Sequence, residues 1–369
     1  MYIYELPEWP HFIWAQEVIT PLLASVRYEQ GRLLGRMENF GFKLREDATL
    51  LTLTQDVLKS SEIEGENLDA QQVHSSIARR LGMDIGGLIP SNRDVDGIVD
   101  MTLDATQNYD KPLTKERLFS WHAALFPTGY SGLLKIKIGV WRDDSHGPMQ
   151  VISGAYAHER VHYQAPKATR LDKEMAIFLE WFNQSPTGDI VLKAAIAHLW
   201  FVTLHPFEDG NGRIARAIAD MALAQSEQTP QRFYSMSSHI RLKRNEYYKI
   251  LEQTQKNSLD ITPWMAWFLT CLKEAIQKAD ITLNAILFKA QFWRKLSAHS
   301  LNDRQRKVLN LMLDGFEGKL TTSKWAKLTK CSQDTAHRDI LNLVQQGILI
   351  INPQGGRSTS YSLSSFPNI

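Results

Sequence analysis

A twelve-residue stretch, residues 205–216, constrains the fold of this chain more than any other feature. It reads His-Pro-Phe-Glu-Asp-Gly-Asn-Gly-Arg-Ile-Ala-Arg. The apolar run 194–204 before it predicts a buried helix that ends ahead of the proline, and the apolar run 215–224 after it predicts a second helix. The first N–H groups of a helix have no partner within the helix. The stretch therefore predicts two helices joined by a turn that can bind an anion.

The second half of this stretch has the side chains of a phosphate-binding turn. Gly210, Asn211 and Gly212 predict a nest of backbone N–H groups, because glycine adopts positive φ and lets the backbone approach an anion closely. Arg213 and Arg216 lie one helical turn apart and project to the same side. We expect them to bind outer phosphate oxygens.

Two further residues of the stretch carry the groups of a reaction centre. Asp209 is placed to bind Mg²⁺, and His205 is placed to act as a base. Residue chemistry alone thus predicts metal-assisted transfer at a phosphoanhydride. The alternative is a tight helix–turn–helix with surface charge, which would need only the Gly-Asn-Gly segment.

Residues 205–216 match the signature of Fic-domain proteins, His-Pro-Phe-x-Asp/Glu-Gly-Asn-Gly-Arg-x-x-Arg, at every defined position. The resemblance implies a mainly α fold, with a Fic helical-bundle core and a β-hairpin flap. It also implies a protein AMP transferase that uses ATP and Mg²⁺ and modifies a Ser, Thr or Tyr hydroxyl of a target protein. Some Fic relatives transfer phosphocholine, UMP or phosphate instead.

The acidic segment 60–67, Ser-Ser-Glu-Ile-Glu-Gly-Glu-Asn, predicts a helix end with Gly65 as the cap. Carboxylates at a helix C-terminus are unfavourable, so three within five residues favour an external cation over a solvated turn. Ser60 to Gly65 resembles the Fic inhibitory motif, Ser/Thr-x-x-x-Glu-Gly/Asn. The resemblance implies that Glu64 bonds Arg216 and withdraws it from the ATP γ-phosphate, while Ser60 helps to position Glu64.

Two other functions stay open at this stage. In some Fic relatives the inhibitory glutamate also aligns a water that removes AMP, so Glu64 is compatible with a de-AMPylating or bifunctional enzyme. The other alternative is a nucleotide-sensing, DNA-binding regulator. The complete signature argues against a pure sensor, which has no need of His205.

Segment 127–166 lacks helical periodicity and contains short β-like runs at 150–152 and 160–163, which predict a β-hairpin. The resemblance implies that this hairpin is a flap that holds the target by strand pairing. Its three histidines, at 146, 158 and 162, are spaced irregularly and favour a surface loop over a metal site.

A helix at about 239–257, capped by 236–238, carries Tyr247 and Tyr248. The resemblance implies an aromatic residue near here in the adenine pocket, and ordinary packing of the tyrosines is the alternative. The remaining predicted helices span 21–43, 47–59, 68–81, 94–109, 114–125 with a cap at Thr114, 171–183, 190–204 and 262–298. Residues 1 to about 20 are expected to be extended and resemble the N-terminal region of a subset of bacterial Fic proteins.

Residues 300–369 differ from the rest in charge, with nine Lys or Arg and five Asp or Glu. Predicted helices at 303–313, 323–329 and 332–345, followed by two short strands, resemble a winged helix-turn-helix. The third helix would expose the side chains Gln333, Asp334, His337 and Arg338, with Arg357 in the wing. The modest charge, and repulsion of phosphate by Asp334 and Asp339, leave DNA and a protein partner equally open.

Composition sets the remaining expectations. A chain of 369 residues with 43% hydrophobic content can form several domains, and we expect boundaries giving 1–95 (N-terminal helical region with the inhibitory helix), 96–296 (Fic core) and 297–369 (winged helix). A net charge of +2, two distant cysteines and the absence of a long apolar run predict a cytoplasmic protein without a membrane partner. The sequence is also compatible with a homodimer.

Overall fold

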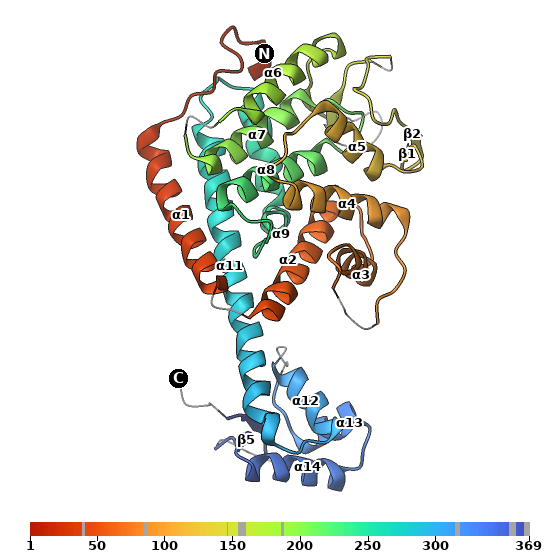
Figure 1. Ribbon diagram of the computed structural model, residues 1–369, viewed down its shortest axis with the longest axis vertical. Coiled ribbons are helices and arrows are strands. Elements are labelled where there is room, and N and C mark those ends of the chain that lie inside the picture. Colours follow the sequence, from red (N-terminus) through yellow and green to blue (C-terminus); the bar gives the residue numbers. More distant parts are fainter. Residues whose placement is uncertain are drawn as a thin grey trace. The chain divides into compact units, whose positions relative to one another are not determined.

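The computed structural model describes residues 1–38, 41–83, 87–145, 147–153, 160–185, 188–313, 318–353 and 359–364. The chain divides into two compact units, Met1–Asp280 and Ile281–Ile369 (Figure 1). The finer division at residues 95 and 296 stays a prediction. Within the described residues, no helix is both long and apolar enough to cross a membrane.

The first unit is built mainly of helices, as predicted. They are α1 (Gln16–Glu38), α2 (Phe42–Ile63), α3 (Ala70–Arg80), α4 (Arg93–Gln107), α5 (Lys115–Leu125), α6 (Leu171–Asn183), α7 (Ile190–Leu204), α8 (Asn211–Glu227), α9 (Met236–Leu242), α10 (Arg244–Gln255) and the part of α11 (Thr262–Lys295) up to Asp280. Two 3₁₀ turns, η1 (Ile3–Glu5) and η2 (Ala168–Arg170), complete its helical elements.

Helices α7 and α8 pack against each other in the core of this unit (Figure 1). α7 is apolar around its whole circumference, and every residue from Val191 to Leu204 is buried. α8 presents small side chains to its neighbours, among them Ala215 and Ala222. Residues 205–210 form the loop that connects these two helices. Because both helices are packed in the core, the positions of the two ends of this loop are fixed.

The first two helices differ from the sequence prediction. α1 begins at Gln16 rather than Pro21, because the proline is accommodated inside the helix, where it removes a single backbone hydrogen bond. The N-terminal 20 residues are therefore not wholly extended. α2 begins at Phe42 and runs on to the buried Ile63, well beyond the predicted range 47–59.

The predicted strand pair is present in the first unit. β3 (Gln150–Ser153) pairs antiparallel with β4 (Arg160–Gln164), with a bulge between Val151 and Ile152. The connection between them, with His158, lies outside the described residues, as does His146. His162 Nδ1 lies 2.7 Å from Glu252 on α10.

A second strand pair was not predicted. β1 (Tyr130–Ser131) pairs antiparallel with β2 (Leu134–Lys135). The single helix predicted at 239–257 is also wrong, because the chain breaks at Lys243 into α9 and α10. Ser235, not the segment 236–238, caps α9 by accepting a hydrogen bond from the N–H of Ser238.

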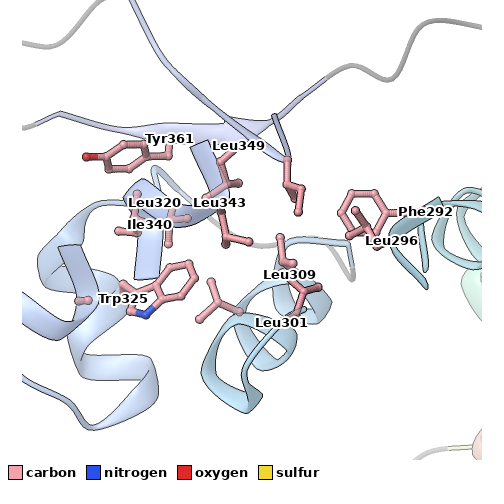
Figure 2. Packing of buried hydrophobic residues seen from close by; sticks show 13 residues of the cluster. Phe292, Leu296, Leu301, Leu309, Leu320, Trp325, Ile340, Leu343, Leu349 and Tyr361 are labelled. Carbon is pink, nitrogen blue, oxygen red and sulfur yellow. The ribbon is translucent and has the colours of Figure 1, made fainter. Parts of the chain in front are cut away.

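The second unit contains η3 (Leu296–Ala298), α12 (Asp303–Leu313), α13 (Thr322–Thr329), α14 (Gln333–Gln345), β5 (Leu349–Ile351) and β6 (Tyr361–Leu363). Figure 2 shows its core, in which Trp325, Leu343 and Leu309 gather with Phe292. Ser332 caps α14, and β5 pairs antiparallel with β6. These elements occur in the predicted order, while their assignment as a winged helix stays a prediction.

One prediction about exposure in this unit is wrong. Asp339 is buried and paired with Arg304, so it does not face solvent as a charge that repels phosphate. The predicted recognition residues of α14 at 333, 334, 337 and 338 are exposed, and Arg357 lies outside the described residues.

Candidate active site

The loop between α7 and α8 reverses the chain through two residues of positive φ. His205 ends α7 in the left-handed region, with φ 48° and ψ 57°, and its N–H donates to the Phe201 carbonyl. Gly210 has φ 80° and precedes α8. A Cβ on Gly210 would lie 2.9 Å from the Phe126 ring, so both the φ angle and the close approach require glycine here.

Asn211 shapes this loop from the first position of α8. Its buried side chain accepts a hydrogen bond from the Phe207 N–H at 3.0 Å and donates to the Phe207 carbonyl at 2.8 Å. The Phe207 ring is itself buried and stacks on His122 with ring centroids 4.2 Å apart. The Asn211 side chain therefore holds the loop, which leaves its backbone N–H as the group that can serve the predicted nest.

The His205 imidazole is in its neutral, proton-accepting form at neutral pH. Burial lowers the pKa of His205 to about 4, and the positive charge of Arg142 acts in the same direction. His205 Nδ1 lies 3.3 Å from the Val202 carbonyl. Because a carbonyl can only accept, we assign the proton to Nδ1, which leaves Nε2 as the basic nitrogen.

The Asp209 carboxylate is fixed at both oxygens. Oδ1 accepts a hydrogen bond from the Gly210 N–H at 2.6 Å, and Oδ2 accepts one from the Ser131 hydroxyl of β1. Sequence reasoning missed Ser131, because a serine in a short unpredicted strand carries no local signal.

Arg216 is buried and bound by the end of α2. Its NH1 lies 2.8 Å from Glu64 Oε1, and its Nε and NH2 donate to the hydroxyl and carbonyl of Ser60, each at 2.9 Å. Ser60 thus contacts the arginine, whereas the sequence analysis expected it to position Glu64. A Cβ on Gly212 would lie 2.2 Å from Glu64 Oε1, so only glycine allows this approach.

Arg213 is bound by a second carboxylate of the same acidic segment. Its NH1 donates to Glu66 Oε2 at 2.6 Å, and its guanidinium lies 5.0 Å from the centroid of the Phe126 ring. Gly65, with φ 89°, lets the chain turn between the two glutamates. The acidic pattern predicted an external cation for this segment, yet no rule in the sequence assigned Glu66 to a particular arginine.

A cavity of about 420 Å³ opens beside Arg213. Its lining includes the polar side chains of Glu66 and Ser131 together with the aromatic rings of Phe126 and Tyr130. The cavity therefore adjoins both Arg213 and the serine that holds Asp209.

The two tyrosines of α10 pack near Glu64 and Arg216. Tyr247 is buried, its hydroxyl lies 2.8 Å from His198 Nε2, and burial raises its pKa. Tyr248 is 37% exposed and donates to the Ile63 carbonyl at 3.2 Å. Because Tyr247 is buried, ordinary packing is favoured for that residue, whereas Tyr248 is partly accessible to solvent.

Two family models match this chain. Residues 112–223 match the Fic/DOC family, and residues 2–83 match a domain of unknown function, DUF4172. A relative from Nematostella vectensis named protein adenylyltransferase Fic is 30% identical over 113 residues, which cover 30% of this chain and 25% of the relative. A probable protein adenylyltransferase of Aquifex aeolicus (strain VF5) is 33% identical over 76 residues, 21% of this chain and 22% of the relative. The matches thus span about a quarter of these relatives.

Solved structures support the same assignment at the level of the fold. A Fic family protein from Desulfovibrio desulfuricans G20 matches with a TM-score of 0.53 and 20% identity, over 97% of this chain and 99% of that one. A Fic-domain protein from Bacteroides thetaiotaomicron matches with a TM-score of 0.50 and 18% identity, over 72% and 98% of the two chains. Residues 112–223 of this chain, which include the loop with His205, thus match the Fic/DOC family, and the chain shares the fold of these Fic proteins.

Proposed function

We propose that this protein is a protein adenylyltransferase that transfers AMP from ATP to a Ser, Thr or Tyr hydroxyl of a target protein. The observation that carries the proposal is the grouping of His205, Asp209, Arg213 and Arg216 around one loop and helix start. Relatives of the Fic/DOC domain named protein adenylyltransferase support the choice of AMP as the transferred group.

The reaction follows from the chemistry of these groups. The target hydroxyl oxygen attacks the α-phosphorus of ATP, and the bond from that phosphorus to the bridging β-oxygen breaks. The hydroxyl proton passes to Nε2 of the neutral His205, and pyrophosphate leaves. The products are the AMP-modified protein and pyrophosphate.

The anion site would consist of backbone and arginine donors. The N–H groups of Asn211 and Gly212 would face a developing negative charge at the start of α8, and Arg213 and Arg216 would bind the outer phosphates. The Gly210 N–H would join them only after releasing Asp209 Oδ1. Asp209 fits Mg²⁺, because this ion is commonly held by one or two carboxylates together with substrate phosphates. When bound, Mg²⁺ would neutralise charge on the α- and β-phosphates.

The target would be held by the strand pair β3–β4. A segment of the target can add to this pair through backbone hydrogen bonds, which select for an extended conformation more than for particular side chains. The same pairing would present a hydroxyl of the target to His205.

We further propose that the protein is autoinhibited through Glu64. The γ-phosphate of ATP and the Glu64 carboxylate require the same guanidinium, and Arg216 already makes three contacts to Ser60 and Glu64. ATP would therefore be bound in a pose that does not align its α-phosphorus. Glu66 would act in the same way on Arg213.

Two differently labelled forms of ATP test the reaction. Label on the α-phosphate should become covalently attached to the protein itself or to a target in a lysate, and label on the γ-phosphate should not. Incorporation of the γ-label would show phosphate transfer and contradict the proposal.

A His205→Ala variant separates the enzyme from a regulator that only senses nucleotide. We expect loss of AMP transfer with ATP binding nearly unchanged, because the histidine accepts a proton and does not hold phosphate. A regulator that only senses nucleotide would show the same activity and nucleotide binding with and without His205.

A second experiment tests the alternative reaction, removal of AMP. An AMP-modified target would be incubated with the protein and Mg²⁺ in the absence of ATP, and loss of AMP from the target would reveal this activity.

A further inference from the structure

Arg142 is a buried cation whose hydrogen bonds converge on the corner of the catalytic loop. Its side chain is only 1% exposed. Nε donates to the His205 carbonyl at 2.8 Å, and the backbone N–H of Arg142 donates to the Pro206 carbonyl at 2.9 Å. A single residue therefore binds both carbonyls at the point where α7 ends.

The other donors of this guanidinium reach the segment that follows β4. NH2 donates to the Pro166 carbonyl at 2.6 Å, and NH1 donates to Asp144 Oδ1 at 3.0 Å. Asp144 Oδ2 in turn accepts the N–H of Ala168 at 2.8 Å. Arg142 thus links the loop of His205 to the base of the β3–β4 pair.

The backbone of His205 needs such support. A residue with a Cβ is disfavoured in the left-handed region, and it stays there only where its surroundings over-determine the conformation. A buried arginine is likewise unfavourable unless its donors are satisfied. The hydrogen bonds to the carbonyls of His205 and Pro206 support the loop, and the three bonds from the guanidinium satisfy the buried charge of Arg142.

We propose that Arg142 is a positioning residue that fixes the His205 imidazole for proton transfer and couples it to the strand pair that would hold the target. This role rests on the proposed function. The hydrogen bonds of Arg142 go neither to the nest nor to the two arginines that would bind ATP, so it would act on the reaction through the loop of His205 and the base of the strand pair.

The charge of Arg142 adds an electrostatic consequence. Three charged groups act on the His205 imidazole: Arg142 lowers its pKa, while Asp209 and Glu64 raise it. Removal of the positive charge at 142 should therefore raise the pKa of His205, whereas a lysine there should leave it nearly unchanged.

The test compares Arg142→Lys and Arg142→Met in a Glu64→Gly background, where we expect activity high enough to measure. Misplacement of a catalytic group by about 1 Å costs on the order of 100-fold in rate. We expect kcat to fall by about that factor in both variants, with KM for ATP within about twofold. Only Arg142→Met should move the acidic limb of the kcat–pH profile to higher pH, because only that variant loses the charge.

Arg232→Lys is the matched control. Arg232 is equally buried and donates to the carbonyl and carboxylate of Asp220, away from the loop of His205. It should lower thermal stability without changing the pH profile or kcat per folded molecule. An equal fall of kcat in Arg142→Lys and Arg232→Lys, measured per folded molecule, would overturn the positioning role.

A readout without turnover separates this inference from the proposed function. The pKa of His205, followed by NMR of its imidazole in the folded protein, should rise in Arg142→Met and stay near that of the parent in Arg142→Lys. The expected shift with no AMP transfer in any variant would contradict the proposed reaction and leave the link between Arg142 and His205 in place. An unshifted pKa would overturn the link itself, and if Arg142→Met does not fold, Arg142→Gln serves in the same measurement.

Discussion

Arg216 and Arg213 lie one turn apart on α8, yet the protein holds them in different surroundings. The Arg216 side chain is 3% exposed and meets Glu64, which is 29% exposed, together with two oxygens of Ser60. The Arg213 side chain is 5% exposed, but its carboxylate partner Glu66 is 46% exposed, and the Phe126 ring lies against the guanidinium. One arginine is enclosed by the end of α2, and the other is bound from the side of solvent.

This difference predicts two contacts of unequal strength. An exposed ion pair typically contributes about 0–1 kcal/mol, because water and salt screen it and two side chains must be ordered. A charge-assisted pair in a water-poor site with further hydrogen bonds to the same guanidinium is stronger. Glu64 should therefore dominate the inhibition, and Glu66 should adjust it.

Removal of the stronger contact has the largest expected effect. Glu64→Gly should raise AMP transfer at least about tenfold, which requires only about 1.4 kcal/mol of barrier. Incorporation of α-labelled ATP measures this gain. Arg216→Ala in the same background should abolish the gain, because the released guanidinium is the group that the substrate needs. Equal rates for the wild type and Glu64→Gly at saturating ATP would refute autoinhibition by Glu64.

Removal of the weaker contact should have a smaller effect of the same sign. Glu66→Gln should raise AMP transfer by about threefold, since a contribution of roughly 0.6 kcal/mol corresponds to that factor. Glu62→Gln is the matched control, because Glu62 belongs to the same acidic segment, in the last turn of α2, but pairs with Lys59 and Arg241. If Glu66→Gln raised AMP transfer as strongly as Glu64→Gly, the prediction that the Glu64–Arg216 contact is the stronger of the two would be wrong.

Salt should distinguish the two contacts by a still smaller effect. The screening length falls from about 10 Å at 0.1 M salt to about 3 Å at 1 M, and exposed pairs are weakened most. Over this range the ratio of Glu66→Gln to wild-type activity should fall towards one. The ratio for Glu64→Gly should change by less than about twofold. If both activity ratios fell to the same extent with added salt, the two ion pairs would lie in equivalent environments, which would contradict this prediction.

Local signals predicted much of the helical framework. The bounds of α6 and α7 agree with the sequence analysis, because each helix has a strong apolar pattern and α7 has a capping residue, Asp189. Thr114 caps α5 as expected. The break at Lys243 was missed because the apolar spacing continues through it, and β1–β2 was missed because two-residue strands have no readable pattern.

The site required information that no local pattern contains. Glu64 could be matched to Arg216 only through the resemblance to Fic proteins, since charge alone offered many partners. Ser131 and Arg142 lie in a segment without regular periodicity, and their roles depend on contacts with Asp209 and His205 far along the chain. Such residues become visible only when the fold has brought the segments together.

The central claim is that Glu64 and the γ-phosphate compete for Arg216, and the affinities of ATP and ADP test it most directly. In the wild type, calorimetry should give Kd values for the two nucleotides within about twofold, because the γ-phosphate meets an arginine that is already paired. In Glu64→Gly, ATP should bind about tenfold more tightly than ADP, which corresponds to about 1.4 kcal/mol for the contact with the γ-phosphate. The same ratio of ATP to ADP affinity in both proteins would contradict the account.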